Sequence, residues 1–331
     1  MANDADTQEI PDLARRMQEE LFRDVEIKSH SSERPLLAHY TSLGAFEKIV
    51  FSSELWMSHP LLMNDRDELR SVIDAGRGIL SRSERLRQAC KNNKAFTDLV
   101  DSFNLARNHY TQFLEKLTFM ICFSVHDLAD NDGKLGMWRG YGGNGSGIAL
   151  VLDTKKIESA ANVNSPFYLN PLVYLSNDQR IDRIQSAVEK IATLFENRDL
   201  SETDLKWAAV VFLEWLKMFS LFTKHNGFAE EREWRLVYLG DRDLRGVYHD
   251  LFTYLIGPRG PQPKMRIPLT QHSAIGGQDL RLETLVHQII LGPALYDQLP
   301  LNAFAVHNML RQAKRDTLSK HVVISTIPFR G

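Results

Sequence analysis

Residues 140–152 read GYGGNGSGIALVL, with five glycines in the first eight positions and an unbroken apolar run in the last five. The apolar run predicts a buried strand over residues 148–152. In dinucleotide-binding and phosphate-binding loops the glycines open a helix, because the helix N-terminus binds the phosphate. Here the glycines precede a strand, so the stretch lacks the context of a Rossmann or phosphate-binding loop.

Helices and strands alternate irregularly on both sides of this stretch, which favours an α+β fold with a largely antiparallel or mixed sheet. Apolar runs predict strands over residues 36–40, 55–58, 117–123, 233–240, 263–267, 286–291 and 321–326. Amphipathic spacing predicts helices over residues 9–24, 42–51, 177–198, 201–222 and 297–314, and two more between residues 67 and 117 with a polar break at 91–93. We expect an N-terminal helix and connector over residues 1–35 and a single domain over residues 36–331, with a helical insertion at about 67–117.

The composition is that of an ordinary globular protein, with 331 residues of which 43% are hydrophobic and 25% charged. This mixture excludes wholesale disorder and a coiled-coil rod. Lysine and arginine total 40 and aspartate and glutamate 42, so the net charge of −2 does not indicate a polyanionic partner. The two cysteines, Cys90 and Cys122, form no C-x-x-C pair and suit a reducing cytoplasm.

No targeting or membrane-spanning segment is expected. The N-terminal sequence MANDADTQEIPDL is acidic and lacks the apolar core of a secretory signal. The most apolar window, residues 205–222, carries Glu214 and two lysines and is too short and interrupted to cross a bilayer. We expect this window to be a buried helix that begins after Ser201, with Asp204 completing a capping box, and we expect a cytoplasmic protein.

The common catalytic motifs are absent from the sequence. It contains no G-x-x-x-x-G-K-[ST], no H-E-x-x-H and no G-x-S-x-G, and its 11 histidines lack metal-ligand spacing. These absences exclude several large enzyme classes, and no metal site is expected.

Four polar or aromatic clusters stand out against this background. They are His39-Tyr40-Thr41-Ser42, Asn64-Asp65 with Glu68, Cys122-Phe123-Ser124 with Trp138-x-x-Tyr141, and Glu230-Glu231-Arg232-Glu233-Trp234-Arg235. Each has an ordinary structural explanation: a capping hydroxyl, an Asx turn, aromatics covering a glycine-rich hairpin, and a solvated strand face. In a continuous strand, Glu231, Glu233 and Arg235 would point to the same face.

Taken together, these clusters resemble a bacterial family known only as a domain of unknown function, number 2971. The matching pieces run from about residue 36 to the end of the chain. They are HYTS at 39–42, ND at 64–65, CFS at 122–124, W-x-x-Y at 138–141 with Gly147, K-x-x-x-F-x-x-E-x-E-W-R at 224–235, IILGP at 289–293 and VVISTIPFR at 322–330. One departure is Phe228, where many relatives carry tryptophan.

The order of these motifs is similar to that of ADP-ribosyltransferases, which place a His or Arg on a first core strand, a Ser or Tyr on a second and a Glu, often in E-x-E, on a third. The resemblance implies an ADP-ribosyltransferase-like fold and NAD as the substrate. Glu233 would stabilise the oxocarbenium-like state at the nicotinamide–ribose bond, and Glu231 would orient or deprotonate the acceptor. His39 would hydrogen-bond the adenosine ribose.

The same resemblance implies roles for the remaining site residues. Tyr141 and Trp138 would stack on nicotinamide, and Arg235 would bind the diphosphate or pair with one glutamate. The NAD-binding set is completed by Tyr40, Thr41 and Ser124. Asn64, Asp65 and Glu68 would form a substrate loop near the mouth of the site.

Three classes of function remain open from the sequence. The first is an NAD-consuming ADP-ribosyltransferase, such as a toxin or anti-phage effector with an operon-encoded antitoxin, or its NAD glycohydrolase variant. The second is a non-catalytic nucleotide- or nucleic-acid-binding module. The third is another glycosidic or nuclease-like activity that uses the acidic residues, with or without a metal. A macromolecular acceptor is expected, because the insertion carries the basic residues Arg77, Arg82, Arg85, Arg87, Lys91, Lys94 and Arg107.

Overall fold

The computed structural model describes residues 10–23, 34–63, 66–157, 165–257, 260–271, 279–294 and 299–329. The chain divides into two compact units, each built from three separate segments. Unit 1 comprises Met1–Lys28, Asn64–Lys116 and Val173–Asn226, and unit 2 comprises Ser29–Met63, Leu117–Leu172 and Gly227–Gly331. The helices expected as an insertion therefore share unit 1 with the helices of residues 173–226, while the predicted domain boundaries stay a prediction.

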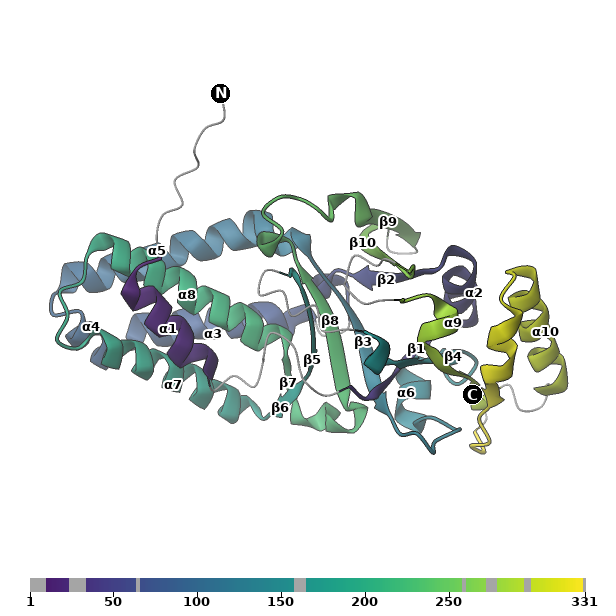
Figure 1. Ribbon diagram of the computed structural model, residues 1–331. Helices are drawn as coiled ribbons and strands as arrows, with labels where there is room; N and C mark the ends of the chain where they lie inside the picture. The colour runs from purple at the N-terminus through teal and green to yellow at the C-terminus, as the bar shows by residue number, and fades with distance from the viewer. Residues whose placement is uncertain are drawn as a thin grey trace, which may run out of the picture. The chain divides into compact units, whose positions relative to one another are not determined.

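Unit 1 is a group of helices around one central helix (Figure 1). Its elements are α1 (Asp12–Arg23), α3 (Arg66–Arg82), α4 (Glu84–Ala89), α5 (Asn93–His109), α7 (Asn177–Phe195), α8 (Glu202–Leu221) and the parallel strand pair β6 (Val173–Leu175) and β7 (Thr223–His225). Helix α8 contacts α1, α3 and α5 and is buried on most of its surface, as the apolar window predicted. No helix among the described residues is long and apolar enough to cross a membrane.

Capping side chains set the ends of these helices. The predicted capping box of α8 is confirmed, because Ser201 Oγ accepts from the Asp204 N–H and the Asp204 carboxylate accepts from the Ser201 N–H. The predicted break at residues 91–93 is also confirmed, with Asn92 capping α5. The prediction of two helices between residues 67 and 117 is wrong: Ser83 caps an additional helix, α4, and so divides the first of them.

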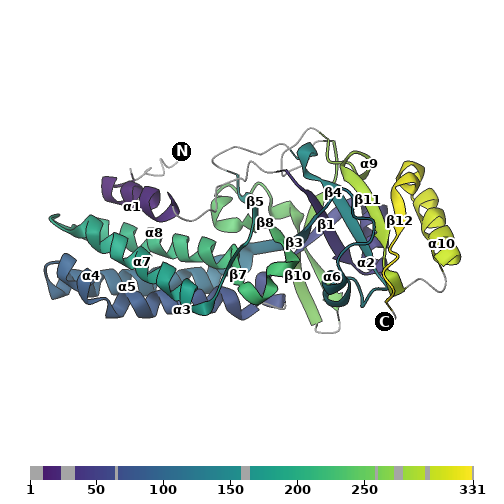
Figure 2. The same ribbon diagram turned by 90° about the horizontal axis from the view of Figure 1, so that it is seen from below.

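Unit 2 contains a sheet that is almost entirely antiparallel, which confirms the α+β class (Figure 2). Its strands are β1 (Leu36–Thr41), β2 (Glu54–Ser58), β3 (Thr118–His126), β4 (Ile148–Asp153), β5 (Phe167–Pro171), β8 (Glu233–Leu239), β9 (Phe252–Gly257), β10 (Gly260–Pro268), β11 (Val286–Leu291) and β12 (Val322–Ile324). The order is β12-β11-β4-β1-β3-β2-β10-β9, with β8 added to β3 and β5 added to β8. Strands β11 and β12 form the parallel pair. The helices of unit 2 are α2 (Leu43–Ser52), α6 (Leu135–Gly140), α9 (Leu282–Leu285) and α10 (Leu299–Gln312).

Strand β3 is the branch point of this sheet. One of its edges pairs with β8 from Thr118 to Ser124. Its other edge pairs with β1 at residues 124–126 and with β2 at Met120, so β1 and β2 diverge between these points. On this edge Cys122 lies between the two pairings.

The two faces of the sheet bury different side chains. One face carries the main core, which includes Leu37, Phe123 and Trp234. The opposite face carries a smaller apolar cluster formed by Ala38, Tyr40, Met137, Trp138, Ala149, Val151 and Ile290, in which α6 supplies the methionine and tryptophan. Because successive residues of a strand alternate between faces, Ser124, Glu233 and Arg235 belong to this second face.

The glycine run after α6 is a tightly packed turn. Gly143, Asn144 and Gly145 all have positive φ, which folds the chain back on itself. Gly147 then passes against the end of β1, where a Cβ atom would lie 2.1 Å from the Thr41 carbonyl oxygen and 2.8 Å from that of Gly142. The run therefore has a steric role at the start of β4.

We predict that Gly147→Ala destabilises the protein by about 3 kcal/mol, because backbone atoms on both sides cannot move aside. Gly140→Ala is the matched control, since a Cβ atom there would meet nothing within 4 Å, and its effect should stay within about 0.5 kcal/mol. Urea denaturation of the two variants checks this expectation. Equal stabilities would show that the turn relaxes without cost.

Candidate active site

His39 lies at the divergence of β1 and β2. Its Nδ1 atom is 3.1 Å from the backbone carbonyl oxygen of Cys122, and the ring meets Phe123 edge-on at 5.8 Å. Burial lowers the pKa of His39, and the hydrogen bond to Cys122 opposes that shift only in part. A carbonyl oxygen only accepts, so the neutral ring carries its proton on Nδ1 and leaves Nε2 as an acceptor.

The structure does not bring His39 and Glu233 to the same face of the sheet. His39 alternates with Ala38 and Tyr40, so its ring lies on the side of Phe123 and the main core. Ala38 pairs with Ser124 and Ser124 with Glu233, which puts the backbones of His39 and Glu233 about 10 Å apart, two strand spacings. The two side chains therefore lie on opposite faces of the sheet.

Four side chains from separate parts of unit 2 form a connected polar cluster, which we call the Ser124 cluster: Ser124, Lys134, Tyr141 and Glu231. Ser124 Oγ donates to the backbone carbonyl of Glu231 at 2.5 Å, and Lys134 Nζ donates to Ser124 Oγ at 3.1 Å. Tyr141 Oη donates to the Glu231 carboxylate at 3.1 Å. Ser124 and Glu231 are buried, Lys134 is half-buried and Tyr141 is 37% exposed, so the tyrosine is the most exposed member of the cluster.

The expectation that Glu231 shares a strand face with Glu233 is wrong. Glu231 ends a 3₁₀ helix (Asn226–Glu231), and β8 begins only at Glu233. Between them Arg232 has a φ of 46°, a left-handed conformation that breaks the extended chain. The Arg232 N–H donates to Ala229, its carbonyl accepts from Val125, and its guanidinium binds Asp127 at 3.0 and 3.2 Å. These contacts hold the turn that separates the two glutamates.

Glu233 and Arg235 do share a face and form a buried ion pair. Arg235 Nε donates to Glu233 Oε1 at 2.7 Å, and Nη2 lies 3.4 Å from Oε2. The two residues are 5% and 3% exposed. Of the two roles expected for Arg235, the structure contains the pairing with a glutamate. Removing either partner would deprive the other of this buried ion pair, which is destabilising.

Trp138 cannot stack on a ligand in this conformation, because its side chain is fully buried. Its ring meets Tyr40 edge-on at 4.9 Å, and its Nε1 donates to the Asp132 carbonyl at 2.8 Å. Tyr40 is also buried, and burial raises the pKa of its phenol to about 12. The Tyr40 hydroxyl accepts from the Lys134 N–H at 3.0 Å, so both aromatic residues support the loop that carries Lys134. Tyr141 keeps an accessible ring.

Thr41 lies at the end of β1, half-buried and paired in register with Ile148. Its carbonyl faces Gly147, which places it beside the glycine turn. The Asn64 and Asp65 positions lie outside the described residues, as does the side chain of Glu68, so the predicted substrate loop stays a prediction.

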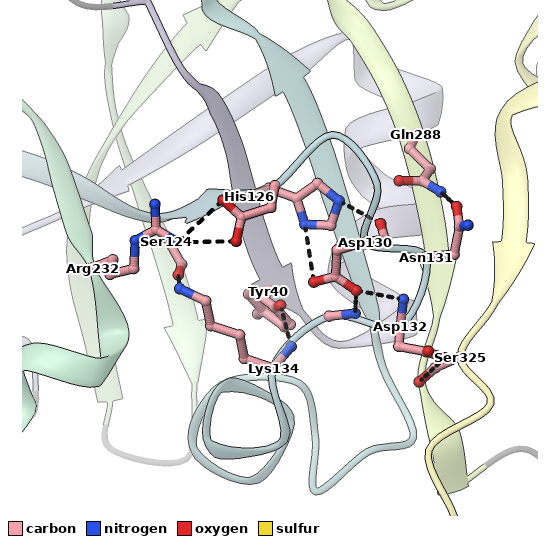
Figure 3. A network of polar contacts seen from close by, with 12 residues as sticks. Tyr40, Ser124, His126, Asp130, Asn131, Asp132, Lys134, Arg232, Gln288 and Ser325 are labelled. Atoms are coloured by element: carbon pink, nitrogen blue, oxygen red, sulfur yellow. Dashed lines mark hydrogen bonds and ion pairs between the residues drawn. The ribbon is translucent and has the colours of Figure 1, made fainter.

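The loop of residues 126–134 positions Lys134, a residue that sequence reasoning did not assign to the site (Figure 3). His126 Nε2 binds the Asp130 carbonyl, and the Asp130 carboxylate accepts from the N–H groups of Asp132 and Gly133. Asp132 in turn accepts from the Thr326 hydroxyl at 2.9 Å. Burial lowers the pKa of Lys134, and the positive charge of Arg232 lowers it further. The only sequence signal for this loop was its density of turn-forming residues.

Several basic residues of unit 1 pair with acidic neighbours in the same unit. Arg85 binds Glu189 and Glu196, Lys91 binds Asp199, and Arg107 binds Asp74. These exposed pairs reduce the positive charge that the helices present to a polyanion. No group of three or more metal-ligating side chains occurs among the residues the structure describes.

Comparison with known proteins gives one match. A family model described as "Protein of unknown function (DUF2971)" matches residues 137–236. The matched stretch contains Tyr141, Glu231, Glu233 and Arg235 and does not reach His39 or Ser124. No curated protein and no solved structure matches the chain significantly. The match supports the resemblance to this family over the second half of the site and implies no activity.

The lowered pKa of His39 predicts a pH dependence of stability. As pH falls, the unfolded chain takes up a proton at His39 near the ordinary pKa of 6.5, before the folded chain does. The contribution of His39 to the free energy of unfolding is therefore complete above that pH and is lost as pH falls. We expect the free energy of unfolding of the wild type to fall more between pH 7.5 and 5.5 than that of His39→Gln. The glutamine keeps a donor for the Cys122 carbonyl and has no proton to take up.

Urea denaturation at several pH values measures this difference. His109→Gln, at an exposed histidine of unit 1, is the control and should keep the wild-type slope. Identical slopes for the wild type and His39→Gln would contradict the burial of a neutral His39.

Proposed function

We propose that unit 2 binds NAD and transfers its ADP-ribosyl group to an acceptor. The observation that carries this proposal is the convergence of Ser124, Tyr141, Glu231 and Glu233, which come from distant parts of the sequence. Ser124 lies opposite Glu233 in the β3–β8 ladder and also binds the backbone of Glu231. A serine on one core strand beside glutamates at the start of another is the arrangement that the resemblance to ADP-ribosyltransferases implies.

The chemistry assigns different roles to the two glutamates. The nicotinamide–ribose bond breaks with its electrons leaving on nicotinamide, and positive charge develops on the ribose. Glu233 stabilises that charge and hydrogen-bonds the 2-hydroxyl. Glu231 takes the proton of the acceptor as the new bond to the ribose forms. Tyr141 lies at the accessible side of Glu231 and offers a ring for nicotinamide to stack on.

A second candidate function is a non-catalytic nucleotide-binding module. It is favoured by the buried ion pair, because a Glu233 carboxylate held by Arg235 is less available to a developing positive charge. Such a module binds NAD and releases no nicotinamide, which separates it from a transferase in one assay. For the transferase, we propose a macromolecular acceptor in the cytoplasm, as in a toxin or anti-phage effector.

We predict that Glu233→Gln lowers the rate of nicotinamide release from NAD by about 100-fold or more, because it removes the charge that stabilises the transition state. Glu231→Gln should lower ADP-ribose incorporation into an acceptor more than it lowers nicotinamide release. Paired assays of nicotinamide release and incorporation, with and without EDTA, make both measurements. An active Glu233→Gln protein would remove the transferase proposal, and sensitivity to EDTA would favour a metal-dependent activity instead.

Stability needs its own control, because Glu233→Gln removes the negative charge from the buried ion pair with Arg235. The double variant Glu233→Gln/Arg235→Gln removes both charges and should melt closer to the wild type than Glu233→Gln alone. If the double variant is folded and inactive, the loss of activity is chemical. Tyr141→Phe, which keeps the ring and removes the bond to Glu231, should retain NAD binding.

A further inference from the structure

One buried polar side chain of unit 2 lacks a partner among the described residues. Asn170 lies on β5 and is 1% exposed, and neither its Oδ1 nor its Nδ2 has a hydrogen-bond partner there. Buried amides in native proteins nearly always have partners, since leaving them unpaired is costly. Within the described part of the chain nothing satisfies the Asn170 amide, which leaves it able to bind a water molecule or a ligand.

The register of the sheet places this amide beside the candidate active site. Asn170 is directly opposite Arg235, and Arg235 is directly opposite Cys122. Residues opposite each other in a ladder share a face, so these three side chains form a row across β5, β8 and β3, which we call the Asn170 row. The row lies on the face that carries Glu233 and Ser124.

The Asn170 row ends on β3 at its most exposed member, Cys122. Cys122 is half-buried and stands where β3 leaves β1 for β2. Strands in a sheet lie about 4.8 Å apart, so the row spans about 10 Å from Cys122 to the amide.

The chemistry of the amide selects the ligand. Asn170 presents one donor group and one acceptor side by side, whichever way the amide is turned. Its complement is a planar neutral group with an adjacent acceptor and donor, such as a primary carboxamide or the amino edge of adenine. A carboxylate offers only acceptors and would leave Oδ1 unpaired. The neighbouring Glu233 and Arg235 compensate each other's charge, so the row has no unmatched charge to attract an ion.

We propose that Asn170 is a ligand-binding residue that recognises a carboxamide or adenine-like edge. The proposal rests on the proposed function only in naming NAD, which carries both groups, as their source. Nicotinamide and adenosine are therefore the two probes that distinguish the sources.

Ligand-observed NMR titration of the whole protein tests the proposal. We expect nicotinamide or adenosine to bind. The matched analogue of nicotinamide is nicotinic acid, which lacks the amide donor, and that of adenosine is purine riboside, which lacks the amino group. The analogue of the probe that binds should bind about tenfold more weakly or worse. Asn170→Leu should lose about tenfold in affinity for the probe that binds, and its thermal midpoint without ligand should rise, because the unpaired groups are gone. Asn170→Ala serves the same purpose if leucine does not fit. Tyr168→Phe, on the same face of β5, is the control and should bind like the wild type.

Two results would overturn the proposal. One is wild-type affinity for the probe in folded Asn170→Leu or Asn170→Ala, which would mean that the amide holds only water. The other is failure of the wild type to bind either probe. Nicotinamide release from NAD is scored separately: a wild type that binds a probe through Asn170 and cleaves no NAD keeps this site and loses the transferase function. If the wild type and Asn170→Leu cleave NAD equally well and bind the probe equally well, the transferase function is kept and the Asn170 site is lost.

Discussion

The hydrogen bond from Ser124 Oγ to the Glu231 carbonyl connects the branch strand of the sheet to the turn that opens β8. Ser124 stands at the one position where β3 pairs with β1 on one edge and with β8 on the other. Its hydroxyl also accepts from Lys134, so the loop of residues 126–134 is attached at the same atom. A buried hydroxyl with its donor and acceptor capacity both used is costly to disturb. The position of the glutamates, and with it every proposed step of the chemistry, depends on this atom.

The divergence of β1 from β2 is the second constraint on the site. An unbroken sheet would pair the backbone of β3 on both edges, including the carbonyl of Cys122. Here the Cys122 carbonyl is met by the His39 ring in place of a strand neighbour. Because burial lowers the pKa of His39, the ring that fills this position is neutral and offers Nε2 as an acceptor. This contact between β1 and β3 is thus polar without being charged.

Much of the fold could be predicted from local patterns, and the site could not. Most helices and strands of the structure follow apolar periodicity and capping residues, including the Ser201 capping box and the Asn92 cap. The short strand β5 was missed, because Phe167–Pro171 contains a buried asparagine and a proline and so lacks a strand signature. Trp138 was misassigned because sequence shows that an aromatic residue is present and does not show which face it buries. Lys134 had no signal at all, since its position depends on hydrogen bonds between residues distant in the chain.

The two glutamates illustrate why a motif and a geometry differ. E-x-E in a strand predicts two carboxylates on one face, in one environment. The left-handed Arg232 divides them, and such a conformation in a residue with a side chain costs about 1–2 kcal/mol unless its surroundings hold it. Asp127, Val125 and Ala229 hold it here, at both the side chain and the backbone. As a result, the Glu231 carboxylate faces a half-exposed tyrosine while that of Glu233 faces a buried guanidinium. Neighbouring carboxylates in different environments can take different protonation roles. In the proposed transferase reaction, the strained residue between them would let one motif serve both the ribose and the acceptor.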